Sequence, residues 1–534
     1  MVFRWFVPCL RFVQQIDVQV LIRVDASIQI GSGHVMRCLT LADELHREGL
    51  EVHFICRNFP GQMEDVIRKR GHSVTLLSAP KMEYEPAADD PAHAHWLGLS
   101  WERDAEEVER SFSGNKVDWL IVDHYAIDRR WHKRLRSLAG RIMVIDDLAD
   151  RKLDCDLLLD QTYGRSEEVY RPLVPDHCRM LLGAGYALLR PEFARLRSKA
   201  LDKRRRVGSV MNVMISMGSM DPDNVTGQVL DGLALVDWPV KPLVNVVLGG
   251  SAPHLQTVRE QSDAHDLQIK VLTDVTNMAE LMLEADFSIG AGGATSWERC
   301  CMGLPALVAG IAVNQREILR QLGEVGALID LGNCNCLSAA TIANEIGRLL
   351  SDELLPHKMS NNAFAVCDGL GVQLVGLALY PLLARDGNSI GLRDVHIGDA
   401  RIIHKWQQAP ETRRYANNPQ VPEWEGHVRW MNAKIQEVGS YFWIIKHGDA
   451  SAGVLRLDPM QGPDGDSGRL ISILVAPEKY RLGLGRGVLS IAQHIFTDDI
   501  LFAEILPANQ ASRALFESVG FVRQERNLFV WKPR

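Results

Sequence analysis

Two glycine-containing segments carry residues that could handle a phosphorylated sugar. Gly31-Ser-Gly33-His34 lies between an apolar run and a helical pattern, and Ile289-Gly-Ala-Gly-Gly293-Ala-Thr295 does the same in the second half of the chain. Glycine lets the backbone approach a ligand closely, and the amides at a helix start suit an anion. His34 could exchange a proton near neutral pH, although a histidine that only caps the helix fits the spacing equally well.

A third segment of the same kind lies near the carboxyl end. Tyr480-Arg-Leu-Gly483-Leu-Gly485-Arg-Gly487 follows the apolar run 471–475 and precedes a helical pattern over 488–496. Its glycine spacing differs from that of a dinucleotide-binding loop, and no acidic residue is placed to bind a ribose. The segment therefore predicts either an anion-binding loop or a plain turn.

The elements around the first two segments alternate between short apolar strands and helical patterns. We expect strands at 18–24, 52–56, 119–122, 141–145 and 156–159, and then at 213–216, 244–248, 268–272, 287–289 and 306–308. Such alternation is typical of parallel sheets with crossover helices. Two α/β halves should enclose a cleft at the carboxyl ends of their strands, where ligands of open sheets bind.

The length of 534 residues predicts several domains. A basic cluster near 196–208 reads as a solvated helix end or connector, and the turn-rich Arg385-Asp-Gly-Asn-Ser389 reads as a linker. Beyond it, three strand patterns (442–445, 452–457 and 469–475) predict an α+β module. The expected division is an extension over 1–18, α/β halves over 19–200 and 207–380, a linker over 381–390 and a last domain over 391–534.

Composition limits the other classes of function. Net charge is −8 and the pI is near 6.1, which argues against a general nucleic-acid binder. The ten cysteines read as reduced thiols of a cytoplasmic protein, and Cys334-x-Cys336 is a weak candidate metal site. Arg11 interrupts the apolar residues of the first 18, so we expect an irregular extension there, with a peripheral membrane anchor as the alternative.

Several blocks resemble the UDP-sugar hydrolases of pseudaminic acid synthesis, which remove UDP from UDP-2,4-diacetamido-2,4,6-trideoxy-β-L-altropyranose. The resemblance spans about 19–375 and also extends, in the second half, to a GT-B fold N-acetylglucosaminyltransferase. The blocks are Ile22-Arg-Val-Asp25, Ile30-Gly-Ser-Gly-His34-Val-Met-Arg37, Val122-Asp123-His124-Tyr125, Ile145-Asp146-Asp147, Gly183-x-x-Tyr186-Ala-Leu-Leu-Arg190, Gly218-Ser-Met-Asp221 and Asp368-Gly-Leu-Gly371.

This resemblance implies a GT-B-like pair of Rossmann-type domains that hydrolyses the UDP-sugar with inversion. His34 would activate or orient the attacking water and Asp25 would support it. No metal is implied, because loop amides could hold the charge of the departing UDP. The implied substrate-binding residues are Gly33, Arg37, Tyr125, Gly218, Gly292, Gly293, Ala294, Thr295, Glu298, Asn314 and Gln315. The family often has Asn-Gln-Asn where this chain has Asp160-Gln161-Thr162.

The segment 391–531 resembles the GNAT acetyltransferases, an α+β fold that uses acetyl-CoA. The residues implied to bind this cosubstrate are Val475, Arg481, Gly483, Leu484, Gly485, Arg486, Gly487, Asn509 and Ser512. Two positions depart from the family. Tyr480 stands where Arg or Gln is usual, and Phe516 stands where a tyrosine often donates a proton, which phenylalanine cannot do. Tyr415, Glu425 and His427 are possible substitutes, although structural roles suit them better.

We therefore expect a bifunctional enzyme that N-acetylates a UDP-4-amino sugar and then releases UDP from the product. Fusion of successive steps raises the local concentration of the intermediate. One alternative is a GT-B glycosyltransferase with a sugar or lipid acceptor in place of water. Another is a carboxyl-terminal domain that binds acetyl-CoA without catalysis. The sequence predicts no stable membrane insertion and leaves the oligomeric state open.

Overall fold

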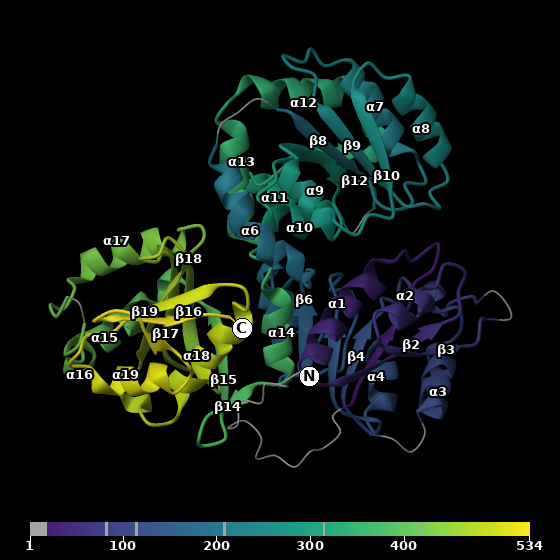
Figure 1. Ribbon diagram of the computed structural model, residues 1–534. Helices are drawn as coiled ribbons and strands as arrows, with labels where there is room; N and C mark the ends of the chain where they lie inside the picture. The colour runs from purple at the N-terminus through teal and green to yellow at the C-terminus, as the bar shows by residue number, and fades with distance from the viewer. Residues whose placement is uncertain are drawn as a thin grey trace, which may run out of the picture. The chain divides into compact units, whose positions relative to one another are not determined.

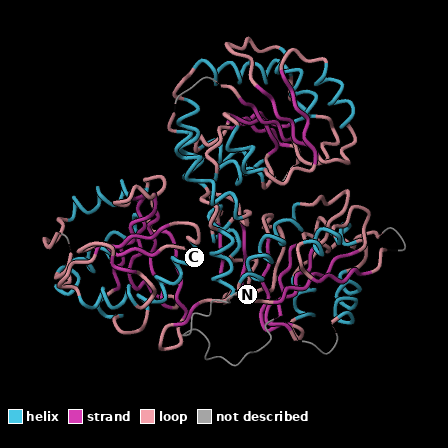
Figure 2. Tube along the Cα trace, in the orientation of Figure 1, coloured by secondary structure: helices cyan, strands magenta, loops and turns pink. Residues whose placement is uncertain are grey.

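The computed structural model describes residues 19–80, 84–112, 116–206, 210–312, 315–416 and 418–533. The predicted extension over 1–18 lies outside these residues. The chain divides into two compact units, a first unit within Gln15–Val372 and a second unit within Gln373–Arg534. Figure 1 shows their helices and strands, and Figure 2 shows strands gathered between helices in each unit.

The amino-terminal half of the first unit is a parallel seven-stranded sheet in the order β3-β2-β1-β4-β5-β6-β7. The strands are β1 (Gln19–Val24), β2 (Glu51–Arg57), β3 (Ser73–Leu77), β4 (Val117–Asp123), β5 (Ala139–Ile145), β6 (Leu157–Asp160) and β7 (Arg179–Leu182). The helices between them are α1 (Gly33–Arg47), α2 (Glu64–Lys69), α3 (Trp101–Ser111), α4 (Arg129–Leu135) and α5 (Glu167–Tyr170), with the 3₁₀ turn η1 (Ala94–Leu97).

The strand order reverses between β1 and β4, which pair directly, with Val24 opposite Asp123. At such a reversal the connecting helices pass to opposite faces and leave a crevice beyond the strand ends. Figure 1 shows α1 and α2 on one side of this sheet and α3 and α4 on the other. The loops that follow β1 and β4 therefore open side by side at this crevice.

A buried ionic network ties α3 to the sheet. The Asp104 carboxylate, which is fully buried, accepts hydrogen bonds from Arg23 Nη2 (2.7 Å), Arg57 Nη2 (2.6 Å) and Trp131 Nε1 (2.9 Å). Burial alone would raise the pKa of Asp104, but the charge of Arg23 and then that of Arg57 hold the pKa below 3.8. The network secures two neighbouring strands, β1 and β2, just before they reach the crevice.

The carboxyl-terminal half of the first unit is a second parallel sheet, in the order β10-β9-β8-β11-β12-β13. The strands are β8 (Asn212–Ser216), β9 (Leu243–Leu248), β10 (Gln268–Thr273), β11 (Phe287–Ala291), β12 (Ala306–Gly310) and β13 (Ile329–Asn333). The helices are α6 (Pro191–Arg204), α7 (Val225–Ala234), α8 (Leu255–Asp263), α9 (Met278–Glu284), α10 (Thr295–Cys301), α11 (Arg316–Glu324), α12 (Ala339–Ser351) and α13 (Leu355–Val366). Its order reverses between β8 and β11, so the loops beginning at Met217 and Gly292 share a crevice.

The basic cluster near 196–208 differs from the predicted solvated connector. Arg197 is buried and donates to the carbonyl oxygens of Cys301 (3.0 Å) and Cys367 (2.7 Å). Arg204 is also buried and donates to the carbonyl oxygens of Ala285 (2.7 Å) and Met282 (2.8 Å). Two of these arginines therefore anchor α6 to the carboxyl ends of helices in this half, which a count of charges along the sequence could not show.

The second unit is built on a mixed eight-stranded sheet in the order β14-β15-β16-β17-β18-β19-β21-β20. The strands are β14 (Leu382–Leu383), β15 (Ser389–Asp394), β16 (Tyr441–His447), β17 (Ala450–Gln461), β18 (Ser467–Val475), β19 (Ile500–Glu504), β20 (Val522–Arg523) and β21 (Leu528–Trp531). The helices are α14 (Gly371–Leu379), α15 (Ala400–Gln408), α16 (Pro410–Arg413), α17 (Trp424–Ile435), α18 (Leu484–Ile495) and α19 (Gln510–Glu517).

The predicted linker over 381–390 is instead part of this sheet. β14 and β15 pair as an antiparallel hairpin, with Leu382 opposite Ile390, and residues 384–388 form its turn. The amide of Gly387, which has a φ of 85°, donates to Ala384 O (3.0 Å). A turn-rich stretch between domains and a hairpin turn share the same composition, so the sequence pattern alone could not separate them.

The stretch Leu355–Leu379 is long and apolar enough by composition to cross a membrane, with a mean hydropathy of 1.5 in its most apolar window. That window is 61 % buried, and the stretch consists of two helices, α13 and α14, rather than one uninterrupted span. Core helices have the same composition, so this single stretch is weak evidence for a membrane span.

We predict that Asp104→Asn destabilises the first unit by roughly 3–5 kcal/mol, because the change leaves buried guanidinium charge without its partner. Hydrogen exchange of β1 and β2 would measure this loss. Because the folded pKa of Asp104 is depressed, the wild-type advantage should be complete at pH 7 and lost as the pH falls below 3.8. Glu106→Gln, on the exposed face of α3, is the matched control and should change exchange little; equal exchange in both variants would contradict the network.

Candidate functional site

The two halves of the first unit line a cleft of about 410 Å³. Seven residues that the sequence analysis assigned to the substrate or to catalysis lie on its wall: Gly33, His34, Arg37, Tyr125, Gly293, Ala294 and Gln315. Nine further residues complete the wall: Ile30, Asp147, Leu148, Gln161, Thr162, Arg165, Trp297, Glu317 and Ile318. The structure therefore brings the two glycine segments of the sequence to one cavity.

His34 lies in the first turn of α1 and is held by the last residue of β4. Its Nδ1 lies 2.7 Å from Asp123 Oδ1, and the carboxylate is completely buried. Burial alone would raise the pKa of Asp123, but the charges of Arg37 and His34 hold it well below the usual carboxyl range. An ionised carboxylate can only accept a hydrogen bond, so Nδ1 carries a proton, and it is Nε2 that has the lone pair whenever the ring is neutral.

Arg37, one turn further along α1, ties the two carboxylates of the cleft together. Its Nε and Nη2 donate to the two oxygens of Asp123 (both 2.6 Å), and its Nη1 donates to Asp147 Oδ2 (3.1 Å). Tyr125 in turn donates its hydroxyl to Asp147 Oδ1. The guanidinium thus fixes the Asp123 carboxylate in a bidentate geometry, which in turn fixes the His34 ring.

An aromatic wall stands beside His34. The His34 ring meets Tyr125 edge-on at 4.7 Å between centroids, and Trp96 of η1 stacks on Tyr125 at 5.5 Å. His93 approaches Trp96 edge-on at 4.8 Å. Neither Trp96 nor His93 was predicted from the sequence, because both lie in an irregular stretch that no periodic pattern marks.

Asp25 does not occupy the place that we predicted for it. The Asp25 carboxylate accepts from Arg23 Nη1 and from the Arg57 amide (both 2.6 Å), and its other oxygen lies 3.2 Å from His124 Nε2. Asp25 is therefore part of the buried network below the cleft, and Asp123 is the carboxylate that contacts His34. Asp25 follows β1 and Asp123 ends the neighbouring strand β4, so spacing in the sequence could not tell which one reaches the histidine.

The second wall of the cleft comes from the loop between β11 and α10. Gly293 and Ala294 line the cavity, Gly292 and Thr295 flank them, and the Oε1 of Gln315 accepts the Ile311 amide (3.0 Å). A Cβ at Gly292 would lie 3.3 Å from Gln315 Cβ, which is a tight contact and favours glycine. Asn314, the remaining predicted sugar contact, lies outside the described residues.

Two further predicted substrate residues, Glu298 and Gly218, lie near this loop, together with the buried Arg299. Arg299 in α10 donates to Ala291 O (2.6 Å) and Ser296 Oγ (3.0 Å), and burial lowers its pKa to about 10, so a buried cation supports the loop from behind. Glu298 pairs with Arg190 (3.5 Å), and burial raises its pKa. Gly218 follows β8 with a φ of 101°, at the strand reversal that it shares with the loop after β11.

The second unit contains a separate candidate site where β18 and β19 diverge. These parallel strands pair over Gly468–Leu470 and Ile500–Phe502, whereas the rest of β18, to Val475, pairs only with β17 among the described residues. The segment 480–487 follows β18 and includes the first turn of α18, in which the Gly487 amide donates to Gly483 O (3.1 Å). The amides of Leu484, Gly485 and Arg486 therefore precede the helical ladder of α18.

Backbone conformation explains the residues of this loop. Arg481 and Gly483 have φ values of 66° and 83°, and Arg385 Nη1 donates to Arg481 O (3.3 Å). A Cβ at Gly487 would lie 2.5 Å from Ile390 Cδ1, so glycine lets α18 pack closely on β15. Asn509 Oδ1 accepts the Ser512 amide (3.1 Å) and caps α19. The side-chain oxygen that we expected to contact the cosubstrate is therefore already engaged in a hydrogen bond within the fold.

The positions considered as proton donors in the second unit make contacts within the fold. Phe516 is buried and meets Phe521 edge-on at 5.0 Å. His427 is buried, donates from Nε2 to Ala400 O (3.0 Å), and has a pKa lowered by burial. The Glu425 side chain is 87 % exposed and lies 3.9 Å from Arg429. These contacts favour the structural roles that the sequence analysis preferred for His427 and Glu425.

Residues 389–522 match the family model described as an acetyltransferase (GNAT) domain. This segment is a GNAT acetyltransferase domain. The predicted α+β fold of the second unit is thereby confirmed, and Figure 1 shows its mixed sheet with α18 and α19. The family match ends before β21, which pairs with β19 and completes the sheet.

The first unit has the GT-B fold. The solved structure of Acinetobacter baumannii MurG superposes with a TM-score of 0.50 at 15 % identity, over 68 % of this chain and 99 % of that one. An uncharacterized protein of Methanocaldococcus jannaschii is 24 % identical over 95 % of this chain and 97 % of its own length, so it is similar across both units. A Campylobacter jejuni protein named UDP-2,4-diacetamido-2,4,6-trideoxy-beta-L-altropyranose hydrolase is 27 % identical over 50 % of this chain and 82 % of its own.

We predict that Asp123→Asn lowers the turnover of the first unit by about 10²–10⁴-fold, because an amide no longer fixes the His34 tautomer. Steady-state release of UDP from a UDP-sugar would measure the loss, with kcat falling more than KM rises. Asp118→Asn, on the same strand five residues earlier and partly exposed, is the matched control. Turnover retained in Asp123→Asn would show that the carboxylate does not act through the histidine.

We predict that Gly483→Ala weakens acetyl-CoA binding about 5-fold, because a Cβ in the left-handed region costs roughly 1 kcal/mol and shifts the loop. The nearest atom to that Cβ, Arg385 Cγ, is 3.5 Å away, so φ rather than crowding causes the effect. Isothermal titration with acetyl-CoA is the measurement. Gly398→Ala, at an open position with ordinary φ in the same unit, should bind as the wild type does; identical affinities for both variants would remove the loop from the cosubstrate site.

Proposed function

We propose that the first unit hydrolyses a UDP-linked diacetamido-trideoxy-hexose to UDP and the free sugar, with inversion. The observation that carries this proposal is the His34–Asp123 pair, which lies in a cleft shared with the Gly293–Ala294 segment of the other half. A base and an anion-binding loop in one cavity suit displacement of a nucleotide from an anomeric carbon. The similarity to the C. jejuni hydrolase supports the same assignment.

In the proposed reaction, a water oxygen attacks the anomeric carbon of the sugar. His34 Nε2 accepts the water proton, and the bond between the anomeric carbon and the β-phosphate oxygen breaks. Asp123 stabilises the imidazolium that forms, in the way that a buried carboxylate orients a catalytic histidine. The electron pair leaves on the phosphate oxygen, so UDP departs from the face opposite the water.

The proposed substrate positions follow from the two walls. Tyr125, Trp96 and Gln315 would border the sugar, with the aromatic rings against its methyl and acetyl groups. The loop Gly292–Thr295 would bind the diphosphate through its amides without a metal ion, and Glu298 would accept from ribose hydroxyls. Gly33 and Gly218 would allow the backbone of each half to approach the ligand closely.

The second unit is proposed to acetylate the 4-amino group of the preceding UDP-sugar with acetyl-CoA. The amine nitrogen attacks the acetyl carbonyl carbon, the carbon–sulfur bond breaks, and the amine proton passes to the CoA thiolate, directly or through water. Since Phe516 cannot donate this proton, positioning of the two reactants must supply most of the rate. A GNAT domain in the same chain as the proposed hydrolase supports this pairing.

Two observations also fit a second candidate function, which is a glycosyltransferase with a second unit that binds acetyl-CoA without catalysis. The GT-B fold is also the fold of MurG, so the first unit could transfer the sugar to an acceptor other than water. The buried Phe516 is compatible with a second unit that binds acetyl-CoA without catalysis. Release of UDP in the absence of any added acceptor favours hydrolysis over transfer.

We predict that the wild-type chain releases UDP from the diacetamido UDP-sugar in buffer alone, and that His34→Ala slows this release at least ~10²-fold because the water loses its base. Coupled detection of UDP is the measurement. His46→Ala, on the same helix but exposed, is the matched control. Hydrolysis by His34→Ala at the wild-type rate would refute the role of the histidine, and no UDP release without an acceptor would refute hydrolysis.

A further inference from the structure

The segment between β6 and α5 lines the cleft with three side chains that the proposed reaction does not use. These are Gln161, Thr162 and Arg165. Gln161 is committed to the fold, since its Oε1 accepts the Leu188 amide (2.7 Å). Arg165 is the charged member of the three, and its side chain is only 15 % exposed.

Arg165 is held in place by two acceptors from its own half. Its Nε donates to Asp160 Oδ2 (2.6 Å), and its Nη2 donates to Asp147 O (2.9 Å). Asp160 is completely buried and also accepts from the Tyr170 hydroxyl (2.9 Å) and the Thr162 amide (2.7 Å). Such a buried, fully hydrogen-bonded carboxylate positions the guanidinium, while Nη1 has no protein acceptor among the described residues.

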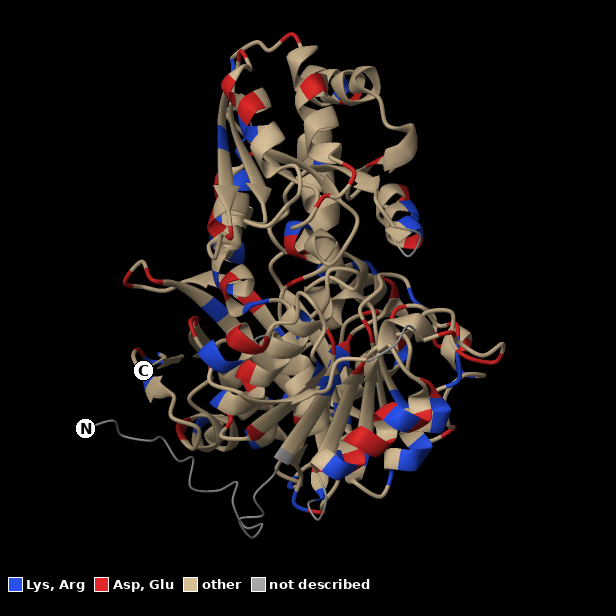
Figure 3. Cartoon of the chain, turned by 90° about the vertical axis from the view of Figure 1, so that its right-hand side faces the viewer, with Lys and Arg blue, Asp and Glu red and all other residues tan. Residues whose placement is uncertain are grey.

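The charges of the cleft leave Arg165 as the cation that can meet a ligand. Arg37 already bridges Asp123 and Asp147. Of the acidic residues on the wall, Glu317 is bound by Arg320 and Gln321 (both 2.7 Å). Burial raises the pKa of Asp160 to about 6 against the opposing charge of Arg165, so this carboxylate is mostly ionised at pH 7 and holds the guanidinium through a charge-assisted hydrogen bond. Figure 3 shows acidic and basic residues interspersed along the chain.

The segment also lies where the two halves meet. A Cβ at Gly164 would be 3.4 Å from the side-chain amide of Gln321, which belongs to α11 of the other half. Arg165 shares the cleft wall with Gly293 and Ala294. A ligand bound to that loop would therefore place its anionic group within the cavity that the guanidinium borders.

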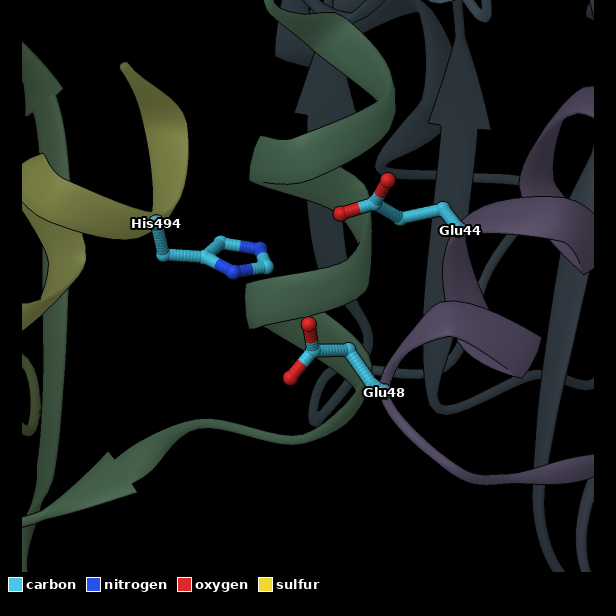
Figure 4. A group of neighbouring side chains, drawn as sticks. All are labelled: Glu44, Glu48 and His494. Atoms are coloured by element: carbon cyan, nitrogen blue, oxygen red, sulfur yellow. The ribbon is translucent and has the colours of Figure 1, made fainter. Parts of the chain in front are cut away.

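We propose that Arg165 binds the β-phosphate of the uridine diphosphate in the cleft, with Asp160 as its positioning residue. The inference rests on the proposed function and adds a residue of the amino-terminal half to a nucleotide site otherwise formed by the carboxyl-terminal half. As the anomeric carbon–oxygen bond breaks, negative charge grows on the β-phosphate, and the guanidinium binds it more strongly than in the substrate. Figure 4 shows three other titratable side chains, Glu44 and Glu48 at the end of α1 and His494 in α18. They belong to different units and play no part in the proposed phosphate binding.

Isothermal titration of the full chain with UDP and with UMP tests the proposal, because only UDP has a β-phosphate. Arg165→Gln should weaken UDP binding about 10-fold or more and leave UMP binding within about 2-fold of wild type, since a charge-assisted hydrogen bond is lost at one phosphate. Arg165→Lys should recover part of the UDP affinity. Arg171→Gln, in the exposed α5 pair with Glu167, is the matched control and should bind both nucleotides normally.

A double-mutant cycle separates positioning from folding. Asp160→Asn should weaken UDP binding less than Arg165→Gln does, and the double variant should match Arg165→Gln alone, because Asp160 acts through the arginine. Additive losses, equal losses for UDP and UMP, or wild-type UDP affinity in Arg165→Gln would each overturn the inference. Failure of the proposed hydrolysis has a different signature, in which the wild-type chain binds UDP and Arg165→Gln does not, yet no UDP-sugar is hydrolysed.

Discussion

The first unit depends on the carboxylate of Asp123, which stands at the reversal of strand order between β1 and β4. Three hydrogen bonds from His34 and Arg37 converge on it, and it is completely buried. A buried carboxylate is stable only if hydrogen-bond donors compensate for its lost hydration. The bonds from His34 and Arg37 to Asp123 therefore also fix α1 against the sheet. The same contacts leave His34 with one basic nitrogen, which links the stability of the crevice to the chemistry that it can perform.

The fold was largely predictable from the sequence, because apolar strands alternating with helical patterns allow few arrangements. The parallel sheets, the two halves and the glycine segments at strand ends followed from this pattern and were supported by the family resemblance. The prediction of a linker over 381–390 was wrong, since hairpin turns and linkers contain the same types of residue. Arg197 and Arg204 were misjudged because burial of a charged residue depends on carbonyl groups far away in sequence.

The sequence predicted which loops form the site, but not which side chains contact one another there. Seven assigned residues reach one cleft, yet the carboxylate that contacts His34 is Asp123, to which no role was assigned, and not Asp25. Trp96 and Arg165 lie in irregular segments, where no periodicity predicts which side chain faces a cavity. In the second unit, the loop before α18 was recognisable from its glycines, whereas the capping role of Asn509 became visible only in the hydrogen bonds.

We propose that the two units catalyse consecutive reactions on one sugar nucleotide, acetylation first and removal of UDP second. Mass spectrometry of the products formed by the full chain from the UDP-4-amino sugar, with and without acetyl-CoA, tests this claim most directly. The account predicts UDP and the free N-acetylated sugar when acetyl-CoA is present, and unchanged substrate when it is absent. Release of the free amino sugar without acetyl-CoA, or recovery of unmodified substrate in its presence, would contradict the account.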